Sequence, residues 1–227
     1  ELRQRANIEM EVLAHPLIVE ELEKRWNMKF FGPSFLPRYE FMGNKRIETV
    51  QDLKGVKIRI SGLNSKALQL FGAVPTMVTA PEGYTALDRG TIDSFGFPYT
   101  YGFGSFKLYE VSKYVTDGFN MSGFMCFQGV NIKAWNAAPE PVRQALPRAQ
   151  TEAIEAMIKA YQAADEYWIP IFREHLEIVQ IAPAERAKLQ EGSSKIWNEW
   201  ADQQTEKGRP GHEILEFVKA TVARYMK

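Results

Sequence analysis

The chain has 227 residues, which allows one large domain or two small ones with a substantial core. Its 28 Lys and Arg residues balance its 28 Asp and Glu residues, so overall charge favours neither nucleic acid nor an acidic membrane surface as a partner. The single cysteine, Cys126, excludes a disulfide or a cysteine-based zinc site within one chain, and its apolar neighbours predict a buried thiol. No apolar run approaches the ~20 residues of a membrane-spanning helix, and the charged residues 1–5 are unlike a signal peptide.

The N-terminal part is predicted to be a helix followed by two extended segments. Apolar residues recur at helical spacing over 2–25, with a break expected near Pro16. A strand is predicted at 28–31 and a second extended segment at 39–42, before the turn signal Gly43-Asn44.

The stretch 52–98 alternates strand and helix signals around an arginine. Residues 57–61 predict a short buried strand, in which Ile58 and Ile60 point to one face and Arg59, at mid-strand, points to the other. Both faces of a helix-flanked sheet are usually covered, so a guanidinium there needs an anionic partner or an opening.

Further elements of the same kind follow. They are a helix at 67–71 closed by a left-handed Gly72, a strand at 74–79, a helix from Pro81 to Gly90, and a strand starting at Ile92 and running into Ser94. This alternation favours a parallel sheet, in which ligands bind beyond the carboxyl ends of the strands. Residues 93–98 are predicted to lie at such an end.

The C-terminal half is predicted to turn from strands to helices. Aromatic residues alternate with small ones over 99–106, where they either line a ligand pocket or pack between lobes. The expected elements are strands at 114–115 and 123–132, helices from Pro139 that end or kink near Pro147 and Pro170, an extended piece at 179–181, a helix from Pro183 and a last helix at 213–225.

Five sequence blocks in this order resemble the solute-binding (DctP-type) proteins of TRAP transporters. They are Asp-Leu-Lys-Gly-x-Lys-Ile-Arg at 52–59, Phe-Gly-Ala-x-Pro at 71–75, Tyr-x-Ala-Leu-x-x-Gly-x-Ile-Asp at 84–93, Leu-Tyr-Glu-Val-x-Lys-Tyr at 108–114 and Asn-x-x-x-Trp at 131–135. The resemblance is close over residues 37–150 and looser in the helical tail.

The resemblance implies an α/β fold of two lobes arranged as a periplasmic clamshell, with a long C-terminal helical region. Lobe I is expected to comprise 1–36 and 123–162, lobe II to comprise 37–122 with the main ligand-anchoring strand, and 163–227 to pack as helices across both lobes. Family members carry a further strand-helix-strand unit ahead of the first helix, so we expect the first lobe to be incomplete.

The resemblance also implies ligand-binding roles. The family uses the arginine at the position of Arg59 to hold the ligand's carboxylate, which its planar fork matches bidentately; the alternative is a salt bridge from Arg59 to Asp52 or Asp93. Many members have an asparagine where this chain has Phe97, which argues against polar sugar-acid ligands. The full set of candidate ligand-binding residues is Arg59, Phe97, Arg38, Tyr39, Ala80, Asp93 and Tyr99.

No pattern for catalysis or metal binding accompanies these residues. Asp93 either orients backbone amides in a turn or takes part in the site, and His15, His175 and His212 lack metal-ligand spacing. Neither a nucleophile with its base nor a phosphate-binding glycine loop is found. The expectation is therefore a receptor without cofactor or metal.

The functional hypothesis is an extracytoplasmic receptor, not an enzyme. The resemblance implies a periplasmic, monomeric protein whose signal peptide is removed, and which binds an organic acid between its lobes and passes it to the TRAP membrane permease, without nucleic acid as a partner. The alternative is a small α/β enzyme acting on a carboxylate, with Asp93 as acid or base.

Overall fold

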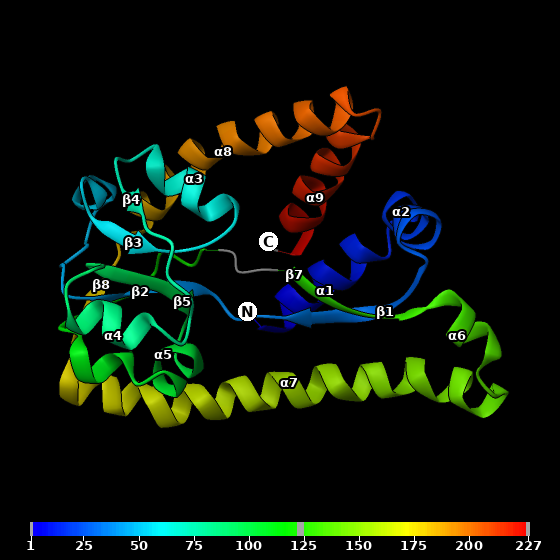
Figure 1. Cartoon of the computed structure of the whole chain (residues 1–227), viewed down its shortest axis with the longest axis horizontal. Coiled ribbons are helices and arrows are strands. Elements are labelled where there is room, and N and C mark those ends of the chain that lie inside the picture. The colour runs from blue at the N-terminus through cyan, green and yellow to red at the C-terminus, as the bar shows by residue number, and fades with distance from the viewer. Residues whose placement is uncertain (1, 122–124, 226–227) are drawn as a thin grey trace. The chain divides into compact units, whose positions relative to one another are not determined.

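The computed structural model describes residues 2–121 and 125–225, which form two compact units (Figure 1). Unit 1 consists of Glu1–Leu36, Phe124–Ala160 and Asn198–Lys227, and unit 2 consists of Pro37–Gly123 and Tyr161–Trp197. The α/β class with a long C-terminal helical region is confirmed. The assignment of segments to the lobes of a clamshell remains a prediction; residues 161–197 group with unit 2 and residues 198–227 with unit 1.

The described part of the chain forms the following elements. The helices are α1 (Leu2–Leu13), α2 (Pro16–Trp26), α3 (Leu63–Gln69), α4 (Gly83–Asp88), α5 (Tyr101–Ser105), α6 (Ile132–Ala137), α7 (Glu140–His175), α8 (Pro183–Glu206) and α9 (Gly211–Tyr225). The strands are β1 (Met28–Phe35), β2 (Tyr39–Gly43), β3 (Lys57–Arg59), β4 (Val74–Pro75), β5 (Ser94–Pro98), β6 (Tyr114–Asp117), β7 (Met125–Asn131) and β8 (Glu177–Gln180). Short 3₁₀ turns lie at Val50–Leu53 and Leu108–Val111.

Unit 1 is built on the antiparallel pair β1 and β7, whose register runs from Met28 opposite Asn131 to Phe35 opposite Met125. Helix α7 packs closely on this pair: Gln150 is buried, and its Nε2 donates a hydrogen bond to the Pro33 carbonyl at 3.1 Å. The neighbouring Gly32 makes this approach possible, because a Cβ there would lie 2.4 Å from the Gln150 amide.

Unit 2 contains a six-stranded sheet in the order β4-β3-β5-β2-β6-β8. Strand β3 is parallel to β4 and β5, whereas β2 is antiparallel to both β5 and β6. The sheet is therefore mixed, not wholly parallel as the strand-helix alternation predicted. In Figure 1, α3 and the start of α8 lie on one side of this sheet, and α4, α5 and the end of α7 lie on the other.

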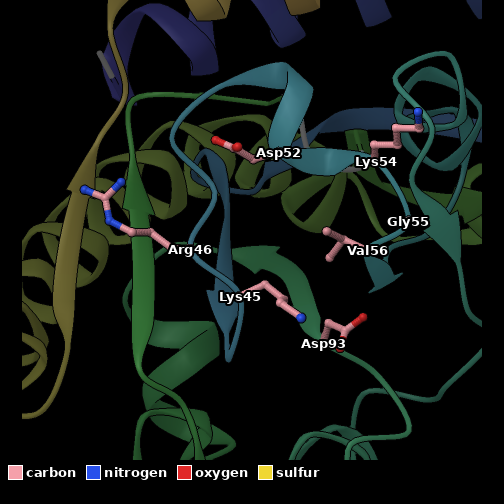
Figure 2. Close-up of a pocket in the computed structure, with 7 residues that line it drawn as sticks. All are labelled: Lys45, Arg46, Asp52, Lys54, Gly55, Val56 and Asp93. Carbon is pink, nitrogen blue, oxygen red and sulfur yellow. The ribbon is translucent and has the colours of Figure 1, made fainter.

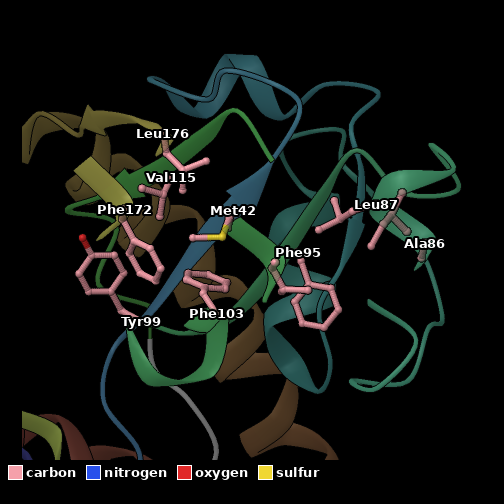
Figure 3. Packing of buried hydrophobic residues seen from close by; sticks show 11 residues of the cluster. Met42, Ala86, Leu87, Phe95, Tyr99, Phe103, Val115, Phe172 and Leu176 are labelled. Carbon is pink, nitrogen blue, oxygen red and sulfur yellow. The ribbon is translucent and has the colours of Figure 1, made fainter. Parts of the chain in front are cut away.

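The main core of unit 2 lies between the sheet and the layer formed by α4, α5 and α7 (Figure 3). Strand residues Met42, Phe95 and Val115 pack there with Phe103 of α5 and Phe172 of α7, and all five side chains are fully buried. This packing fixes the face of β5 on which the candidate site is built.

The boundaries of the strands around Arg59 differ from the prediction. Strand β3 stops at Arg59, so this residue ends the strand and does not lie at its middle, although Ile58 and Ile60 are buried as expected. Strand β4 covers only Val74–Pro75, and β5 begins at Ser94. Asp93 therefore lies just before β5 and not at the end of a strand. Its main-chain N–H donates to the Lys57 carbonyl, and its carboxylate accepts from the Lys57 amide, at the start of β3.

Helix boundaries differ mainly at prolines. Neither Pro147 nor Pro170 ends α7, which continues for 36 residues; buried side chains such as Ile158 and Phe172 offset the loss of one hydrogen bond at each proline. Helix α4 begins at Gly83, two residues after the predicted Pro81. The break near Pro16 is confirmed, since α1 ends at Leu13 and α2 begins at Pro16.

The prediction of a buried Cys126 is wrong, because its side chain is exposed on β7. Among the described strands, β7 pairs only with β1. Apolar neighbours in the sequence therefore do not ensure that the Cys126 side chain is buried. The predicted strand 123–132 is confirmed over Met125–Asn131, and residues 123 and 124 lie outside the described part of the chain. None of the helices described is long and apolar enough to cross a membrane.

Candidate functional site

The centre of the candidate site is the guanidinium of Arg59, at the carboxyl end of β3. Its Nε donates a hydrogen bond to the Val78 carbonyl at 3.0 Å. The loop that carries this carbonyl is held at both ends, since the Thr76 amide donates to the Ile58 carbonyl at 2.9 Å and Thr79 is bonded to Glu82. The loop after β4 thus fixes the direction of the Arg59 side chain.

Arg59 also stacks on two aromatic rings. Its Cζ atom lies 4.7 Å from the centre of the Phe95 ring and 5.3 Å from that of Phe97. These contacts follow from the register, because Arg59 is opposite Phe95, and Phe97 is the next residue on the same face of β5. Ring faces attract a cation without neutralising it, so the guanidinium keeps its charge.

Arg59 has no carboxylate partner within residues 2–121 and 125–225. The alternative of a salt bridge to Asp52 or Asp93 is wrong: Asp52 accepts hydrogen bonds from the Glu48 and Thr49 amides, and Asp93 accepts one from the Lys57 amide at 2.9 Å. The half-buried position lowers the pKa of Arg59 from its ordinary value, and Tyr39 opposes that shift. The structure therefore presents a partly desolvated cation that has no counter-ion in the described part of the chain.

Tyr39 and Phe97 complete an aromatic wall beside this cation. Tyr39 lies opposite Pro98 in the sheet, which brings the start of β2 to the end of β5. The Phe97 ring contacts the Tyr39 ring at a centroid distance of 6.1 Å, the Phe106 ring at 5.6 Å and the Phe95 ring at 5.4 Å. Phe97 is partly buried, so it packs into the unit while remaining accessible at one side.

Arg38 and Tyr99 lie together beside the start of β2. The Arg38 Nη2 atom lies 2.7 Å from Oδ1 of Asp117, and its Cζ lies 4.5 Å above the Tyr99 ring. Tyr99 is only 3% exposed, and burial raises the pKa of its hydroxyl. Unlike Arg59, Arg38 already has a carboxylate partner from the protein.

The contacts of Ala80 and Asp93 are with the core and with the backbone of unit 2. Ala80 is partly buried and packs against the core of unit 2. Asp93 lies at the amino end of β5, where its N–H donates to the Lys57 carbonyl at 2.8 Å and its carboxylate accepts from the Lys57 amide. Its observed contacts match the turn-orienting alternative given by the sequence.

A pocket with a volume of about 330 Å³ opens at the amino end of β3 and β5 (Figure 2). It is lined by Lys45, Arg46, Asp52, Lys54, Gly55, Val56 and Asp93. Arg46 points away from Lys45 and Asp93 in Figure 2 and pairs with Glu48 and Glu177. Four of its lining residues carry exposed charged side chains, namely Lys45, Arg46, Asp52 and Lys54, and Arg59 is not part of the lining.

Two residues beside the site are absent from the set of candidate ligand-binding residues that the sequence predicted. Phe95 carries one ring of the Arg59 platform, and its spacing of two residues from Phe97 was an available signal. Glu40 lies fully buried in β2; a carboxylate between Tyr39 and Phe41 in an apolar strand was the signal there, because unpaired glutamates are rarely buried.

Metal ligation has no support among the residues whose structure is described, which contain no group of three or more His, Cys, Asp and Glu side chains suited to a metal. The histidines have local roles: His15 accepts a hydrogen bond from the Leu17 amide at the start of α2, and His212 lies 2.8 Å from Asp202. The site can thus bind an anion through Arg59, beside ring faces that suit apolar carbon.

Solved structures of high similarity define the fold. A TRAP solute-binding protein from Rhodoferax ferrireducens, in complex with copurified benzoate, matches with a TM-score of 0.81 and 20% identity over 98% of this chain and 70% of that one. The periplasmic ectoine-binding protein of the TeaABC TRAP transporter of Halomonas elongata matches with a TM-score of 0.82 and 18% identity over 99% and 73%. The chain has the fold of TRAP solute-binding proteins, as its sequence blocks predicted.

The family follows from the sequence itself. Residues 37–204 match the family described as bacterial extracellular solute-binding protein, family 7, and the chain belongs to that family. The C4-dicarboxylate-binding periplasmic protein DctP of Rhodobacter capsulatus is 30% identical over 193 residues, which are 79% of this chain and 53% of that protein. A monocarboxylate 2-oxoacid-binding periplasmic protein of Nostoc sp. is 32% identical over 120 residues, 52% of this chain and 33% of that protein. The chain thus spans about a third to a half of these relatives.

Proposed function

We propose that this protein is the periplasmic receptor of a TRAP transporter, which binds an organic acid and delivers it to the membrane permease. The observation that carries the proposal is the half-buried Arg59 at the carboxyl end of β3, for which the described residues provide no carboxylate partner. An arginine in that state gains from a bidentate carboxylate ligand, which replaces its lost hydration. Family membership and the carboxylate-binding names of both curated relatives support the same class of ligand.

Within the site we give Arg59 the anchoring role and Phe97 the role of selecting the body of the ligand. Tyr39 would close the aromatic wall, and Arg38 and Tyr99 would shape the edge beside it. We retain Ala80 and Asp93 as further candidates; the contacts of both support structural roles. Because Phe97 offers no hydrogen-bonding group, each unpaired hydroxyl buried against it would cost ~1–3 kcal/mol. The preferred ligand is an acid with an aromatic or apolar body.

Thermal unfolding with a panel of acids tests this function. Benzoate, mandelate, a branched 2-oxo acid, succinate and gluconate are added separately at pH 7.5, and a ligand at 100 times its dissociation constant stabilises by about 2.7 kcal/mol. We expect the largest rise in melting temperature with an aromatic or branched acid. A largest rise with gluconate would contradict the role of Phe97, and no rise with any carboxylate would contradict the receptor.

The second candidate function is a small α/β enzyme with Asp93 as acid or base. What favours it is the position of this carboxylate in the lining of the pocket at the amino end of β5. Mass spectrometry of each acid after incubation with the protein separates the two functions, because an enzyme converts its ligand and a receptor returns it unchanged. Size-exclusion chromatography with light scattering tests the expected monomer.

A further inference from the structure

Glu40, the second residue of β2, is fully buried and surrounded by hydrogen-bond donors. Its Oε2 accepts from the Thr116 hydroxyl at 2.7 Å and from the Phe119 amide at 3.3 Å. Its Oε1 accepts from the Gly118 amide at 3.0 Å and from the Asn120 amide at 2.9 Å. One carboxylate thus organises the whole turn after β6.

The partners of Glu40 are arranged to donate and not to accept. The Thr116 oxygen already accepts the Phe41 amide at 2.9 Å, so its proton is directed to Glu40. The turn adopts left-handed backbone at Gly118 (φ 128°) and at Asn120 (φ 49°). A non-glycine residue in that region is uncommon, so the carboxylate stabilises a turn that the chain adopts at some conformational cost.

The same turn holds Arg38. Asp117, which directly precedes Gly118, places its carboxylate 2.7 Å from Arg38 Nη2, and Glu40 Oε1 lies 3.9 Å from Arg38 Nε. Tyr99 covers the guanidinium from one side at 4.5 Å. Loosening of the turn would therefore weaken the Asp117 contact that orients the Arg38 side chain.

The turn also holds Tyr39 through its main chain. The Tyr39 amide donates to the Met121 carbonyl at 2.9 Å, and the Met121 amide donates to the Tyr39 carbonyl at 3.1 Å. The Tyr39 ring in turn contacts Phe97 in the aromatic wall beside Arg59. A route of direct contacts thus leads from Glu40 to the candidate site.

We propose that Glu40 is a positioning residue of the acid-binding edge: its buried carboxylate holds the 116–120 turn, and through it the side chains of Arg38 and Tyr39. The effect of Glu40 on ligand affinity rests on the proposed function, whereas its effect on the turn and on Arg38 does not. Glu40 itself does not contact the ligand.

Ionisation of Glu40 provides a direct signal of this role. Burial raises the pKa of Glu40 to about 7, although the hydrogen bonds from Asn120, Thr116 and Gly118 and the charge of Arg38 oppose the shift. The charged group that acts on Glu40 is Arg38, and Glu40 itself acts on the hydroxyl of Tyr99. Asp117 of β6 pairs with Arg38, and both Asp117 and Asp165 of α7 act on Tyr99. Protonation of Glu40 near neutral pH therefore weakens its carboxylate as the hydrogen-bond acceptor for the amides of the turn.

Nuclear magnetic resonance of the ligand-free chain tests the positioning. In the wild type, the amide signals of Gly118 and Asn120 should titrate together with a midpoint near pH 7, and the Arg38 Nε–H signal should be resolved. In Glu40→Gln the titration should disappear, the 118–120 amides should exchange with solvent at least about tenfold faster, and the Arg38 signal should broaden or vanish.

Glu185→Gln is the matched control. Glu185 is a buried carboxylate of unit 2 that accepts the Val50 amide at 2.9 Å, on a different part of the unit. This variant should leave the turn amides, the Arg38 signal and the midpoint near pH 7 unchanged. If it produced the same changes as Glu40→Gln, they would reflect general destabilisation and the proposal would be overturned.

Thr116→Val provides a second route if Glu40→Gln does not fold. It removes one donor to the carboxylate, so the titration midpoint of the Gly118 and Asn120 amides should rise by about half a pH unit or more. An unchanged midpoint would assign the titration to another group and overturn the proposal.

Calorimetric titration with benzoate gives the functional readout. We expect Glu40→Gln to weaken benzoate binding at least fivefold at pH 7.5 and Glu185→Gln to leave it unchanged. If wild type and Glu40→Gln bound benzoate with equal affinity although the turn was loosened in the variant, Glu40 would have only a structural role. That result would overturn its positioning role. If benzoate and the other panel acids do not bind the wild type, the proposed function fails while the ligand-free signals still decide the effect on Arg38.

Discussion

The guanidinium of Arg59 lies against the aromatic rings of Phe95 and Phe97. Phe95 and Phe97 hold the guanidinium in place by stacking, and the Val78 carbonyl takes one N–H. Neither contact uses the negative charge that a salt bridge would supply. The arginine is thus oriented before a ligand arrives, which lowers the ordering cost of binding.

Replacing Phe97 with asparagine should change ligand preference. In Phe97→Asn, the ring face beside Arg59 is exchanged for a hydrogen-bonding amide, so benzoate should bind about 5- to 10-fold more weakly and gluconate should gain affinity. Calorimetry of both acids checks this. Tyr167→Asn, at a 63% exposed site on α7 of the same unit, is the control and should change neither affinity. A parallel loss for both acids in Phe97→Asn would indicate damage to the fold instead of altered preference.

At this scale the sequence predicted the residue but not its surroundings. Alternation with Ile58 and Ile60 predicted that Arg59 lies on its own face of the strand, and the family resemblance predicted that it binds the carboxylate of the ligand. The end of the strand and the carbonyl of Val78 could not be predicted, because they depend on how the loop after β4 folds back. Sequence periodicity reports the face of a residue and not its distant partners.

At the scale of elements, the short helix α5 is fitted to α7 through a glycine. A Cβ on Gly104 would lie 2.2 Å from the ring of Trp168, so α5 can approach α7 only because this position has no side chain. The neighbouring Gly102 plays the same part against Phe97, at 2.6 Å. The glycines of this segment serve close packing within unit 2.

We therefore expect Gly104→Ala to destabilise unit 2 by about 1–3 kcal/mol, because the added methyl group overlaps the Trp168 ring. Ser105→Ala, at an exposed position of the same helix, should change stability by less than about 0.5 kcal/mol. Urea unfolding followed by tryptophan fluorescence measures both. Equal stability of wild type and Gly104→Ala would show that α5 can shift away without cost.

The aromatic residues of segment 99–106 alternate with small ones. From the sequence alone, these rings could either line a ligand pocket or pack between lobes. Tyr99 and Phe103 instead belong to the core of unit 2, and Tyr99 also lies against Arg38 at the edge of the candidate site. Which ring is buried depends on the long helix α7, which lies far away in the sequence and continues past two prolines.

At the scale of the whole molecule, two buried glutamates make stability depend on pH. Burial raises the pKa of Glu9 in unit 1 and of Glu40 in unit 2 to about 7. Between the ordinary pKa of 4.5 and 7, the folded state binds more protons at these sites than the unfolded state, so stability falls as pH rises through this range.

The melting temperature should accordingly decrease from pH 5.5 to pH 8, with each glutamate contributing on the order of 1–3 kcal/mol. Glu9→Gln should remove part of this slope, because glutamine does not titrate and Glu9 has a carboxylate oxygen that is buried without a hydrogen-bond partner among the described residues. Differential scanning fluorimetry at constant ionic strength checks the slope. A melting temperature that rises across this range would contradict the assignment.

The division into two units was expected from the family blocks and not from periodicity. Segments such as 1–36 and 124–160 join one unit although they are far apart in sequence, since β1 pairs with β7. Local patterns locate strands but do not reveal their partners, which explains why the segment 39–42 was predicted as extended while its antiparallel pairing in the sheet of unit 2 was not. The family resemblance predicted that distant segments join the same unit, which composition and spacing could not predict.

The central claim is that Arg59 holds the carboxylate of the ligand. Isothermal titration calorimetry with the panel acid that stabilises the protein most compares wild type with Arg59→Lys, and Arg46→Lys, in the pocket at the other end of β3, serves as the control. A bidentate contact contributes roughly 1.5–3 kcal/mol, so Arg59→Lys should bind about 10- to 100-fold more weakly despite its retained charge. The Arg46→Lys affinity should equal that of the wild type. An unchanged affinity in Arg59→Lys would contradict the account.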